Sequence, residues 1–139
     1  MSTQTSNEIL VSDVMLSMES FPVIEKTVIL KEALEEMGRE NIGIVCIVDE
    51  EKRILGIITD GDLRRKLLKI QKPFSAFFVD DALEHAIRSP ITIDPSDTLK
   101  NAVMLMEEKR IWDIPVVDDA GVLVGLLHLH RVVQALIEK

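Results

Sequence analysis

The sequence predicts an α/β fold built from two copies of one βαββα unit, and an internal repeat is the main observation behind this prediction. Leu30–Arg64 aligns with Leu99–Val133 without a gap, and in both segments a helical hydrophobic pattern is followed by two strand-like runs. The agreement falls on core-type side chains and on the Asp and Gly of turns, so the fold is repeated and not merely the composition. We therefore expect small sheets flanked by helices, pseudo-twofold symmetry and a cleft at the symmetry axis. The identical pairs are Leu30/Leu99, Lys31/Lys100, Ala33/Ala102, Met37/Met106, Ile42/Ile111, Val48/Val117, Asp49/Asp118 and Gly56/Gly125.

The first copy contains each expected element in order. Leu30–Glu40 has apolar residues at i, i+3, i+4 and i+7, which is the spacing of one helix face. Ile44–Val48 and Ile54–Thr59 are β-rich runs joined by a short polar stretch, which indicates a hairpin. A short extended piece at Phe21–Ile24 precedes them, and Asp60–Ile70 reads as a second helix.

The second copy is expected to begin with an extended segment at Pro90–Ile93. Asp94 then has the residue type of an N-cap, and Pro95 suits the first helical position because that position needs no amide hydrogen. We expect this helix to continue to about Arg110. Strands at Ile114–Val117 and Val122–Leu127 and a helix to the C-terminus complete the unit.

These patterns divide the chain into a first repeat at 9–70, a linker with a short helix at 71–89, and a second repeat at 90–139. Within the linker, Pro73–Ser75 is expected to be irregular, and Asp80–Arg88 is expected to form a short helix. This helix is the counterpart of a short helix that is capped by Ser12 and ends at Met18. Packing between the two halves is the plain explanation for Phe74, Phe77 and Phe78, and a partner-binding patch is the alternative.

Composition narrows the range of partners. With a net charge of -8, the chain is not suited to nucleic acid or an anionic membrane surface as its main partner. The sequence has no signal-like N-terminal region and no long apolar stretch, so we expect a cytoplasmic protein. The single cysteine, Cys46, lies in an apolar run and is expected to be a buried, reduced thiol.

No catalytic residues are expected. The sequence has no Ser/His/Asp or Cys/His arrangement at recognisable spacing and no Gly-rich phosphate loop. His128 and His130 share one strand face, but without a nearby carboxylate or Cys pattern they do not predict a metal site. His85 is expected to be a solvated surface residue.

The segment Thr59–Arg65 is the best candidate for ligand binding. Thr59 ends a strand and Asp60 starts a helix, so backbone N–H groups and a positive helix terminus converge there and favour phosphate. The Thr59 hydroxyl adds a possible phosphate contact, and the Asp62 carboxylate can accept hydrogen bonds from both hydroxyls of a ribose. Arg64 and Arg65 follow and are suited to bidentate phosphate contacts.

The same spacing also suits a variant capping box, in which the side chains only satisfy the amides of the helix end. The second copy has His128 and Arg131 in place of Thr59 and Asp62. Arginine has no acceptor for a ribose hydroxyl, so the second site is expected to be empty or to prefer a more anionic ligand held by His128, His130 and Arg131.

This layout resembles the CBS-domain pair, or Bateman module, from about Val11 to Ile137. The apolar strand Ile42–Asp49 and the run Gly56–Leu63 carry the resemblance, together with their counterparts in the second copy. Gly56 and the Thr-x-x-Asp after the strand are similar to the family's nucleotide-ribose motif. The runs TDGDLRR and GLLHLH are most similar to the C-terminal CBS pair of arabinose 5-phosphate isomerases, whose sugar-isomerase domain we expect to be absent from these 139 residues.

The resemblance implies further site residues. Trp112 falls in a stretch similar to the strand that flanks a nucleobase, where it could stack on a base or pack against another subunit, with buried packing as the alternative. Apolar walls for the two clefts are implied at four strand positions whose ordinary role is in the core: Val45, Cys46, Ile114 and Pro115.

The expected function is a regulatory, ligand-sensing CBS module that is not itself an enzyme. In this interpretation an adenine nucleotide (AMP, ADP or ATP) or a CMP-linked sugar binds between the repeats, and an attached or partner enzyme responds. The apolar residues Val132, Val133, Leu136 and Ile137 of the last helix, together with the resemblance, imply a homodimer. The alternative is a ligand-free dimerisation module that positions or inhibits a partner.

Overall fold

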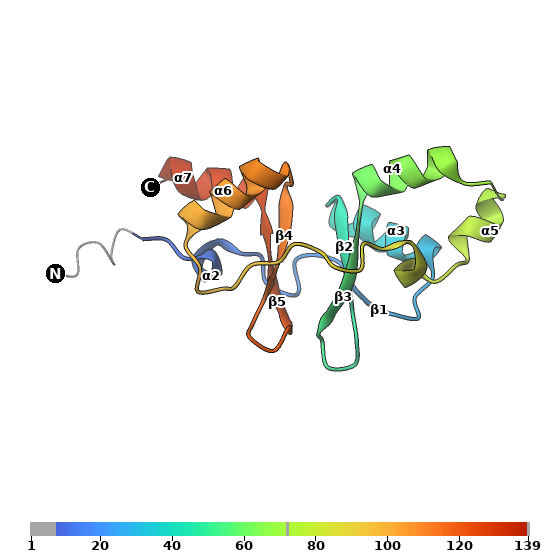
Figure 1. Ribbon diagram of the computed structural model, residues 1–139, viewed down its shortest axis with the longest axis horizontal. Coiled ribbons are helices and arrows are strands. Elements are labelled where there is room, and N and C mark those ends of the chain that lie inside the picture. Colours follow the sequence, from blue (N-terminus) through green and yellow to red (C-terminus); the bar gives the residue numbers. More distant parts are fainter. Residues whose placement is uncertain (1–7, 72, 139) are drawn as a thin grey trace. The chain divides into compact units, whose positions relative to one another are not determined.

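The α/β structure, a computed structural model that describes residues 8–71 and 73–138, divides into two compact units (Figure 1). The central unit is Glu19–Pro90. The terminal unit joins the segment that ends at Met18 to the segment that begins at Ile91. Each unit has its own hairpin, its own helices and its own apolar core, so each can be understood from its own sequence.

The central unit has the predicted βαββα order. It runs through β1 (Val23–Glu25), α3 (Leu30–Glu40), β2 (Ile44–Val48), β3 (Ile54–Thr59) and α4 (Asp60–Lys69). Strand β1 pairs with β2 in parallel, and β2 pairs with β3 antiparallel, giving the sheet order β1-β2-β3. The bounds predicted for α3, β2 and β3 are confirmed, because α3 has the helical spacing of apolar residues and the two strands are apolar runs on either side of a polar turn.

The terminal unit contains α2 (Val11–Val14), α6 (Leu99–Lys109), β4 (Asp113–Val117), β5 (Leu123–His128) and α7 (Leu129–Glu138). The hairpin β4–β5 is antiparallel and forms a two-stranded sheet. The strand predicted at Pro90–Ile93 is reduced to one parallel bridge between Ile93 and Val116. Two backbone hydrogen bonds hold it, from Ile93 N to Pro115 O and from Val117 N to Ile93 O.

The two lead segments, Ser12–Met18 and Asp80–Arg88, fold differently from the sequence prediction. The helix predicted from Ser12 to Met18 is only the four-residue α2, and the helix predicted at Asp80–Arg88 is the 3₁₀ helix η1 (Ala82–His85). The first segment bridges to the terminal unit through Leu16 and Leu126, and the second bridges to the central unit through Ile87 and Ile57. The segment that ends at Met18 therefore belongs to the same compact unit as the second sequence repeat, 90–139. The linker segment Asp80–Arg88 belongs to the same unit as most of the first repeat, 9–70.

The start of α6 corrects a second prediction. The helix begins at Leu99, and the Thr98 side chain caps it by accepting a hydrogen bond from Asn101 N. Asp94 instead closes a turn, because the hydroxyl and amide of Ser96 both donate to its carboxylate at 2.6 and 2.8 Å. These two hydrogen bonds lower the pKa of Asp94.

The phenylalanine-rich linker is also corrected. Residues Phe74–Phe78 form helix α5 and are not irregular. Phe77 is fully buried in the core of the central unit, in contact with partly buried Phe78, whereas Phe74 is exposed. Phe77 thus belongs to the core of one unit. Neither of the two roles expected for it, packing between the halves or binding a partner, matches this position.

The two hairpins have the same register and the same irregularity. Ile44 pairs with Thr59 in one hairpin, and Asp113 pairs with His128 at the equivalent place in the other. Both registers shift at the last residue of the first strand, Val48 or Val117. Such bulges increase the local twist of a strand pair. The turns also agree, since Lys52 and its counterpart Gly121 both have positive φ, 68° and 83°.

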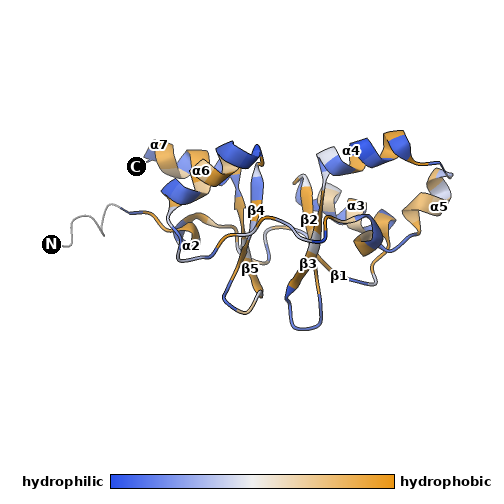
Figure 2. Cartoon of the chain, in the orientation of Figure 1, coloured by the Kyte–Doolittle hydropathy of each residue, from blue (hydrophilic) through white to orange (hydrophobic). Residues whose placement is uncertain are grey.

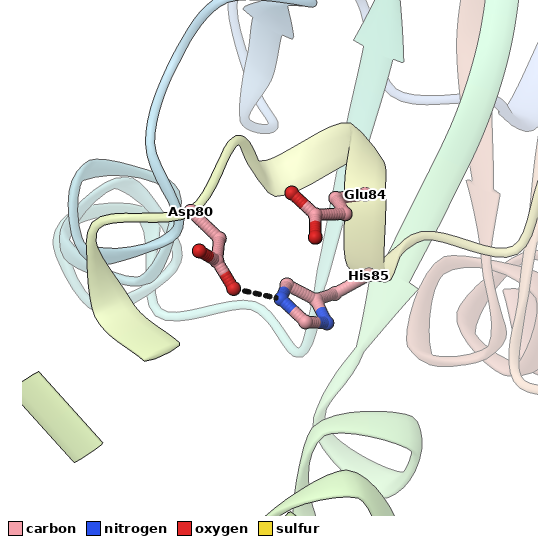
Figure 3. A group of neighbouring side chains, drawn as sticks. All are labelled: Asp80, Glu84 and His85. Atoms are coloured by element: carbon pink, nitrogen blue, oxygen red, sulfur yellow. Dashed lines mark hydrogen bonds and ion pairs between the residues drawn. The ribbon is translucent and has the colours of Figure 1, made fainter. Parts of the chain in front are cut away.

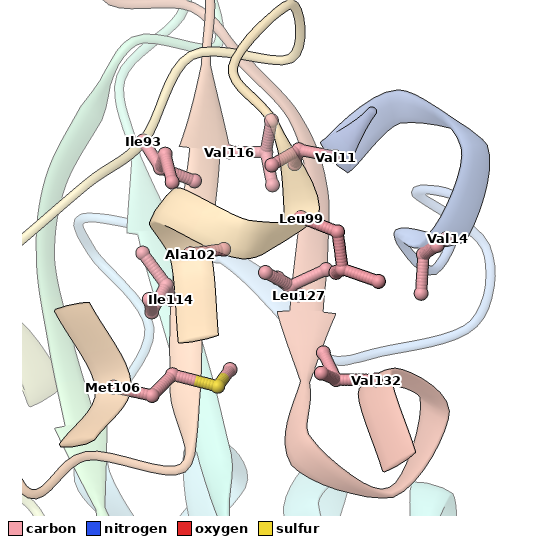
Figure 4. Packing of buried hydrophobic residues seen from close by; sticks show 10 residues of the cluster. All are labelled: Val11, Val14, Ile93, Leu99, Ala102, Met106, Ile114, Val116, Leu127 and Val132. Atoms are coloured by element: carbon pink, nitrogen blue, oxygen red, sulfur yellow. The ribbon is translucent and has the colours of Figure 1, made fainter. Parts of the chain in front are cut away.

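Each unit buries its own apolar cluster. Figure 2 shows hydrophobic colouring along the strands and hydrophilic colouring along the hairpin turns. Figure 4 shows the terminal cluster, where Val11 and Val14 of α2 lie with side chains of α6, the hairpin and α7. The central cluster contains the repeat partners of several of these residues, including Leu30, Ala33 and Met37. The buried pattern confirms the duplication that the sequence indicated.

The repeated glycines explain how the lead segments approach the hairpins. A Cβ at Gly56 would lie 2.8 Å from the carbonyl oxygen of Ile87, and a Cβ at Gly125 would lie 2.8 Å from that of Leu16. By contrast, a Cβ at Gly38 in α3 would meet nothing within 4 Å. Glycine is therefore required at the two hairpin positions because backbone atoms pass close to them.

We predict that Gly56→Ala and Gly125→Ala each lower the free energy of unfolding by about 1–3 kcal/mol, because the new methyl group overpacks a backbone contact. The matched control is Gly38→Ala, which should raise it by about 0.5–1 kcal/mol because alanine loses less entropy in a helix. Urea denaturation followed by circular dichroism measures all three. Equal effects at Gly38 and Gly56 would contradict this explanation.

Candidate functional site

The start of α4 is organised by Thr59, which is its N-cap. The Thr59 hydroxyl oxygen accepts a hydrogen bond from Asp62 N at 3.2 Å and donates one to Asp62 Oδ2 at 2.7 Å. Arg65, one turn later, donates from Nη2 to Asp62 Oδ1 at 2.6 Å. The capping role that the sequence left open for Thr59 is therefore present, and Asp62 is held in one orientation by two neighbours.

Asp62 keeps hydrogen-bonding capacity in this arrangement. Its side chain is 23% exposed, and each of its oxygens receives one of these two hydrogen bonds. An ionised carboxylate has about four lone-pair sites in all, so each oxygen can accept a further donor. The side chain is oriented by the protein and still open to a ligand hydroxyl.

A groove of about 500 Å³ begins at Asp62 and runs along α4. It is bordered by Arg65, Lys66 and Lys69 from α4 and by His85, Ala86 and Ile87 from the segment that bridges to β3. Its volume is within the usual range of small-molecule sites. Three cationic side chains beside one carboxylate suit a ligand that carries both anionic groups and hydroxyls.

Asp60 lies apart from this groove, although it is only two residues from Asp62. Its amide donates to the carbonyl oxygen of Gly43 at 3.0 Å, and its carboxylate occupies the space that a Cβ at Gly43 would need. It borders a second hollow of about 350 Å³ with Asn41, Ile42 and Gly43. The structure thus separates the two aspartates that the sequence placed in one motif.

The other predicted residues of the central unit are placed as follows. Arg64 is exposed and does not line the groove, whereas Arg65 does. Val45 and Cys46 are fully buried in β2, and Val45 packs in the central cluster. Their role in the core is therefore confirmed, and neither residue lines the groove.

The terminal unit has the same backbone at this place but different side chains. Leu129 N donates to Trp112 O at 2.8 Å, just as Asp60 N donates to Gly43 O. His128 Nδ1 lies 2.6 Å from Asp113 Oδ1, across the strand pair that corresponds to Ile44 and Thr59. A His–Asp contact thus takes the place of the Thr59 cap.

His130 and Arg131 follow His128 at the start of α7. The rings of His128 and His130 are 6.5 Å apart between centroids, and Arg131 is exposed. Trp112 is 70% exposed, so the buried-packing alternative for this residue is wrong. Ile114 and Pro115 are buried in β4, and Ile114 packs in the terminal cluster.

Asp62 and Arg65 were identified from the sequence, but the other residues that line the groove, including Lys66 and Lys69, were missed. The spacing of Arg65, Lys66 and Lys69 at i, i+1 and i+4 places them on neighbouring parts of one helix surface, which was a usable signal. The expectation that His85 is a solvated surface residue is wrong: its side chain is 13% exposed and its Nε2 lies 2.8 Å from Asp80 Oδ2. No local pattern indicates this, because the contact depends on the turn that η1 makes.

Among the residues that the structure describes, each helix is too short or too polar to cross a membrane.

The comparisons with known proteins agree on one family. The family model for the CBS domain matches residues 11–69 and 79–138. The chain is 32% identical over 125 residues to the arabinose 5-phosphate isomerase KdsD of Escherichia coli, and the match covers 90% of this chain and 37% of that protein. A protein of Rickettsia prowazekii, RP505, is 28% identical over 120 residues, covering 86% of this chain and 35% of its own length. The chain thus spans little more than a third of these relatives.

Solved structures give the same result. The structure of CBSX2 in complex with AMP is 25% identical, with a TM-score of 0.82, and the match covers 94% of this chain and 97% of that one. The CBS domain pair of MJ0100, in complex with methylthioadenosine and S-adenosylmethionine, has the same fold with a TM-score of 0.77 at 23% identity, covering 94% and 98% of the two chains. The repeat, the two hairpins and both family matches lead to one conclusion: this chain belongs to the CBS-domain family and contains a pair of CBS domains.

Proposed function

We propose that this CBS pair is a ligand-sensing regulatory module that binds an adenine nucleotide or a related nucleotide sugar at the groove of the central unit. The observation that carries the proposal is the orientation of Asp62 by Thr59 and Arg65 at the edge of a cationic groove. The Asp62 carboxylate accepts the ribose hydroxyls, and Lys66 and Lys69 contact the phosphates. Relay of binding to an attached or partner enzyme is part of the same proposal.

The relatives support this assignment of ligand class. CBSX2 was solved with AMP, and the MJ0100 pair was solved with two adenosine derivatives. Each of these ligands has a ribose, which matches a site built around an oriented carboxylate. The similarity to KdsD makes a sugar-phosphate isomerase a reasonable candidate for the regulated enzyme. The second repeat lacks the ribose-binding carboxylate because Arg131 occupies its position, so we propose one nucleotide site in the central unit and an altered site at His128, His130 and Arg131.

We predict that saturating AMP, ADP, ATP or CMP-linked sugar raises the melting temperature of the chain. Ligand at about 100 times its Kd adds about 2.7 kcal/mol to the free energy of unfolding. For a chain of this size that is a shift of roughly 5–10 °C. Thermal-shift measurements across this panel identify the preferred ligand.

The variants Asp62→Ala and Lys69→Gln should weaken the response, because each removes a charge-assisted hydrogen bond to the ligand that contributes about 1.5–3 kcal/mol to binding. Lys109→Gln is the matched control, because Lys109 is an exposed lysine in the last turn of α6 and does not line the groove. The assignment is wrong if no ligand of the panel shifts the melting temperature, or if the shift survives in Asp62→Ala.

We propose further that the chain forms a homodimer through exposed apolar residues on α7 and α4. Val132 packs in the core of its own unit, but Val133, Leu136 and Ile137 remain 43%, 48% and 76% exposed. Ile137 corresponds in the repeat to Leu68 of α4, which is 83% exposed. Both units thus retain a large aliphatic side chain at the same position, where neither core uses it. On α7 this residue joins two other exposed aliphatic residues at i, i+3 and i+4, and contiguous apolar patches mark contact surfaces.

We predict that Ile137→Glu and Leu68→Glu shift the chain from dimer to monomer, because a buried unpaired charge is costly at an interface. Light scattering coupled to gel filtration measures the mass directly. Gln134→Glu on the exposed surface of α7 is the matched control and should leave the mass unchanged. A wild-type monomer, or a dimer that persists in both glutamate variants, would exclude this interface.

A further inference from the structure

We propose that Asp80, Glu84 and His85 form a binding site for one divalent transition-metal ion, with Zn²⁺ as the best match. Figure 3 shows the three side chains turned toward one another around the short helix η1, with a contact between Asp80 and His85. One ligand atom from each residue lies within 4.8 Å of the other two. This is the one His/Cys/Asp/Glu group of its kind in the part of the chain that the structure describes.

The local fold brings these residues together without a regular helix. Asp80 accepts a backbone hydrogen bond at its carbonyl from Leu30 N, which fixes the start of the turn against α3. The amide of Glu84 donates to Asp81 O, which closes the turn that presents Glu84 and His85. The His85 ring packs at the buried side chain of Phe77, 4.6 Å between centroids in a T-shaped arrangement. Asp80 and His85 are therefore held in place before any ion arrives.

The chemistry of the three groups suits a borderline metal ion. Zn²⁺ binds imidazole nitrogen and carboxylate oxygen at about 2.0–2.2 Å, which requires ligand atoms roughly 3–4 Å apart. His85 Nε2 and Asp80 Oδ2 are 2.8 Å apart, so a small further separation of these two atoms admits the ion between them. Two carboxylates balance the two positive charges, and a water molecule completes the usual tetrahedral set.

Glu84 is the ligand that can move, because its side chain is exposed at the surface of η1. Asp80 and His85 differ from it, since their side chains are 17% and 13% exposed and they contact each other. The site thus has two fixed ligands and one adjustable carboxylate at its entrance.

The hydrogen bond between Asp80 and His85 does not by itself explain a histidine here. His85 Nδ1 is buried and has no hydrogen-bond partner in the described part of the chain. Closing the turn onto Asp80 needs only one donor, which a serine or asparagine supplies without burying a second polar nitrogen. Buried unsatisfied polar atoms are rare and often mark a functional group. When a metal ion binds at Nε2, the imidazole proton resides on Nδ1, and a metal-ligating histidine ordinarily donates this proton to a carbonyl, a carboxylate or a water molecule.

The test is calorimetric titration of the chelator-treated, dialysed full chain with Zn²⁺, repeated with Co²⁺, whose visible absorption reports coordination geometry. We expect one equivalent of Zn²⁺ per chain and a Co²⁺ spectrum of four-coordinate type. His85→Gln should abolish binding. Glu84→Gln should weaken it by at least about tenfold, since even indirect partners of a metal ligand are worth 10–100-fold.

Two further variants make the result specific. Glu107→Gln removes an exposed carboxylate on α6 and should bind Zn²⁺ as the wild type does. His128→Gln removes the His–Asp contact of the terminal unit and should also leave Zn²⁺ binding unchanged. The proposal is overturned if the wild type binds no Zn²⁺, if either Glu84→Gln or His85→Gln binds as the wild type does, or if His128→Gln abolishes binding. Because Glu84 is exposed, its variant remains decisive even if His85→Gln proves unfolded by circular dichroism.

Discussion

The backbone hydrogen bond between the first residue of α4 and the residue before β2 is the constraint on which the candidate site depends. Asp60 N donates to Gly43 O, and this bond directs the chain from the end of β3 straight into the helix. Thr59 is thereby placed as the N-cap, with Asp62 in the first turn of the helix and Arg65 one turn after it. Without this junction the three side chains would not share one location.

The second copy shows that the backbone junction is a feature of the repeated fold, whereas the ability to bind a ligand depends on the side chains attached to it. Leu129 N and Trp112 O form the same bond, and the hairpin has the same register and bulge. Yet a His128–Asp113 contact replaces the Thr59 cap, and Arg131 replaces Asp62. A duplicated scaffold can therefore keep its packing while only one copy keeps a carboxylate for a ribose.

The sequence was sufficient to predict the hairpins and α3, because their apolar patterns and turn residues are local and indicate these elements directly. It was insufficient for the lead segments, since the short apolar pattern at α2 carries no information about which hairpin it will contact. Asp94 and Pro95 were misleading for a related reason: an Asx turn and a helix N-cap use the same residue types, and only the Thr98 cap shows where α6 begins. At the site, Thr59, Asp62 and Arg65 followed from spacing. The groove wall at His85 and Ile87 did not, because it is formed by a segment about 20 residues further along the sequence.

Net charge was a poor guide to this groove. The chain carries a net charge of -8, which argues against polyanionic partners as a whole-molecule property, but the groove itself presents Arg65, Lys66 and Lys69. A small anion responds to charges within about one Debye length, about 8–10 Å at ordinary salt, and not to the sum over the surface.

His85 connects the proposed metal site with the groove. It borders the cationic groove and also contacts the Asp80 carboxylate. A cation held by Asp80, Glu84 and His85 would add positive charge beside the groove and fix the imidazole. The proposed metal ion and the proposed nucleotide would then favour one another, and thermodynamic linkage requires that this effect be equal in both directions.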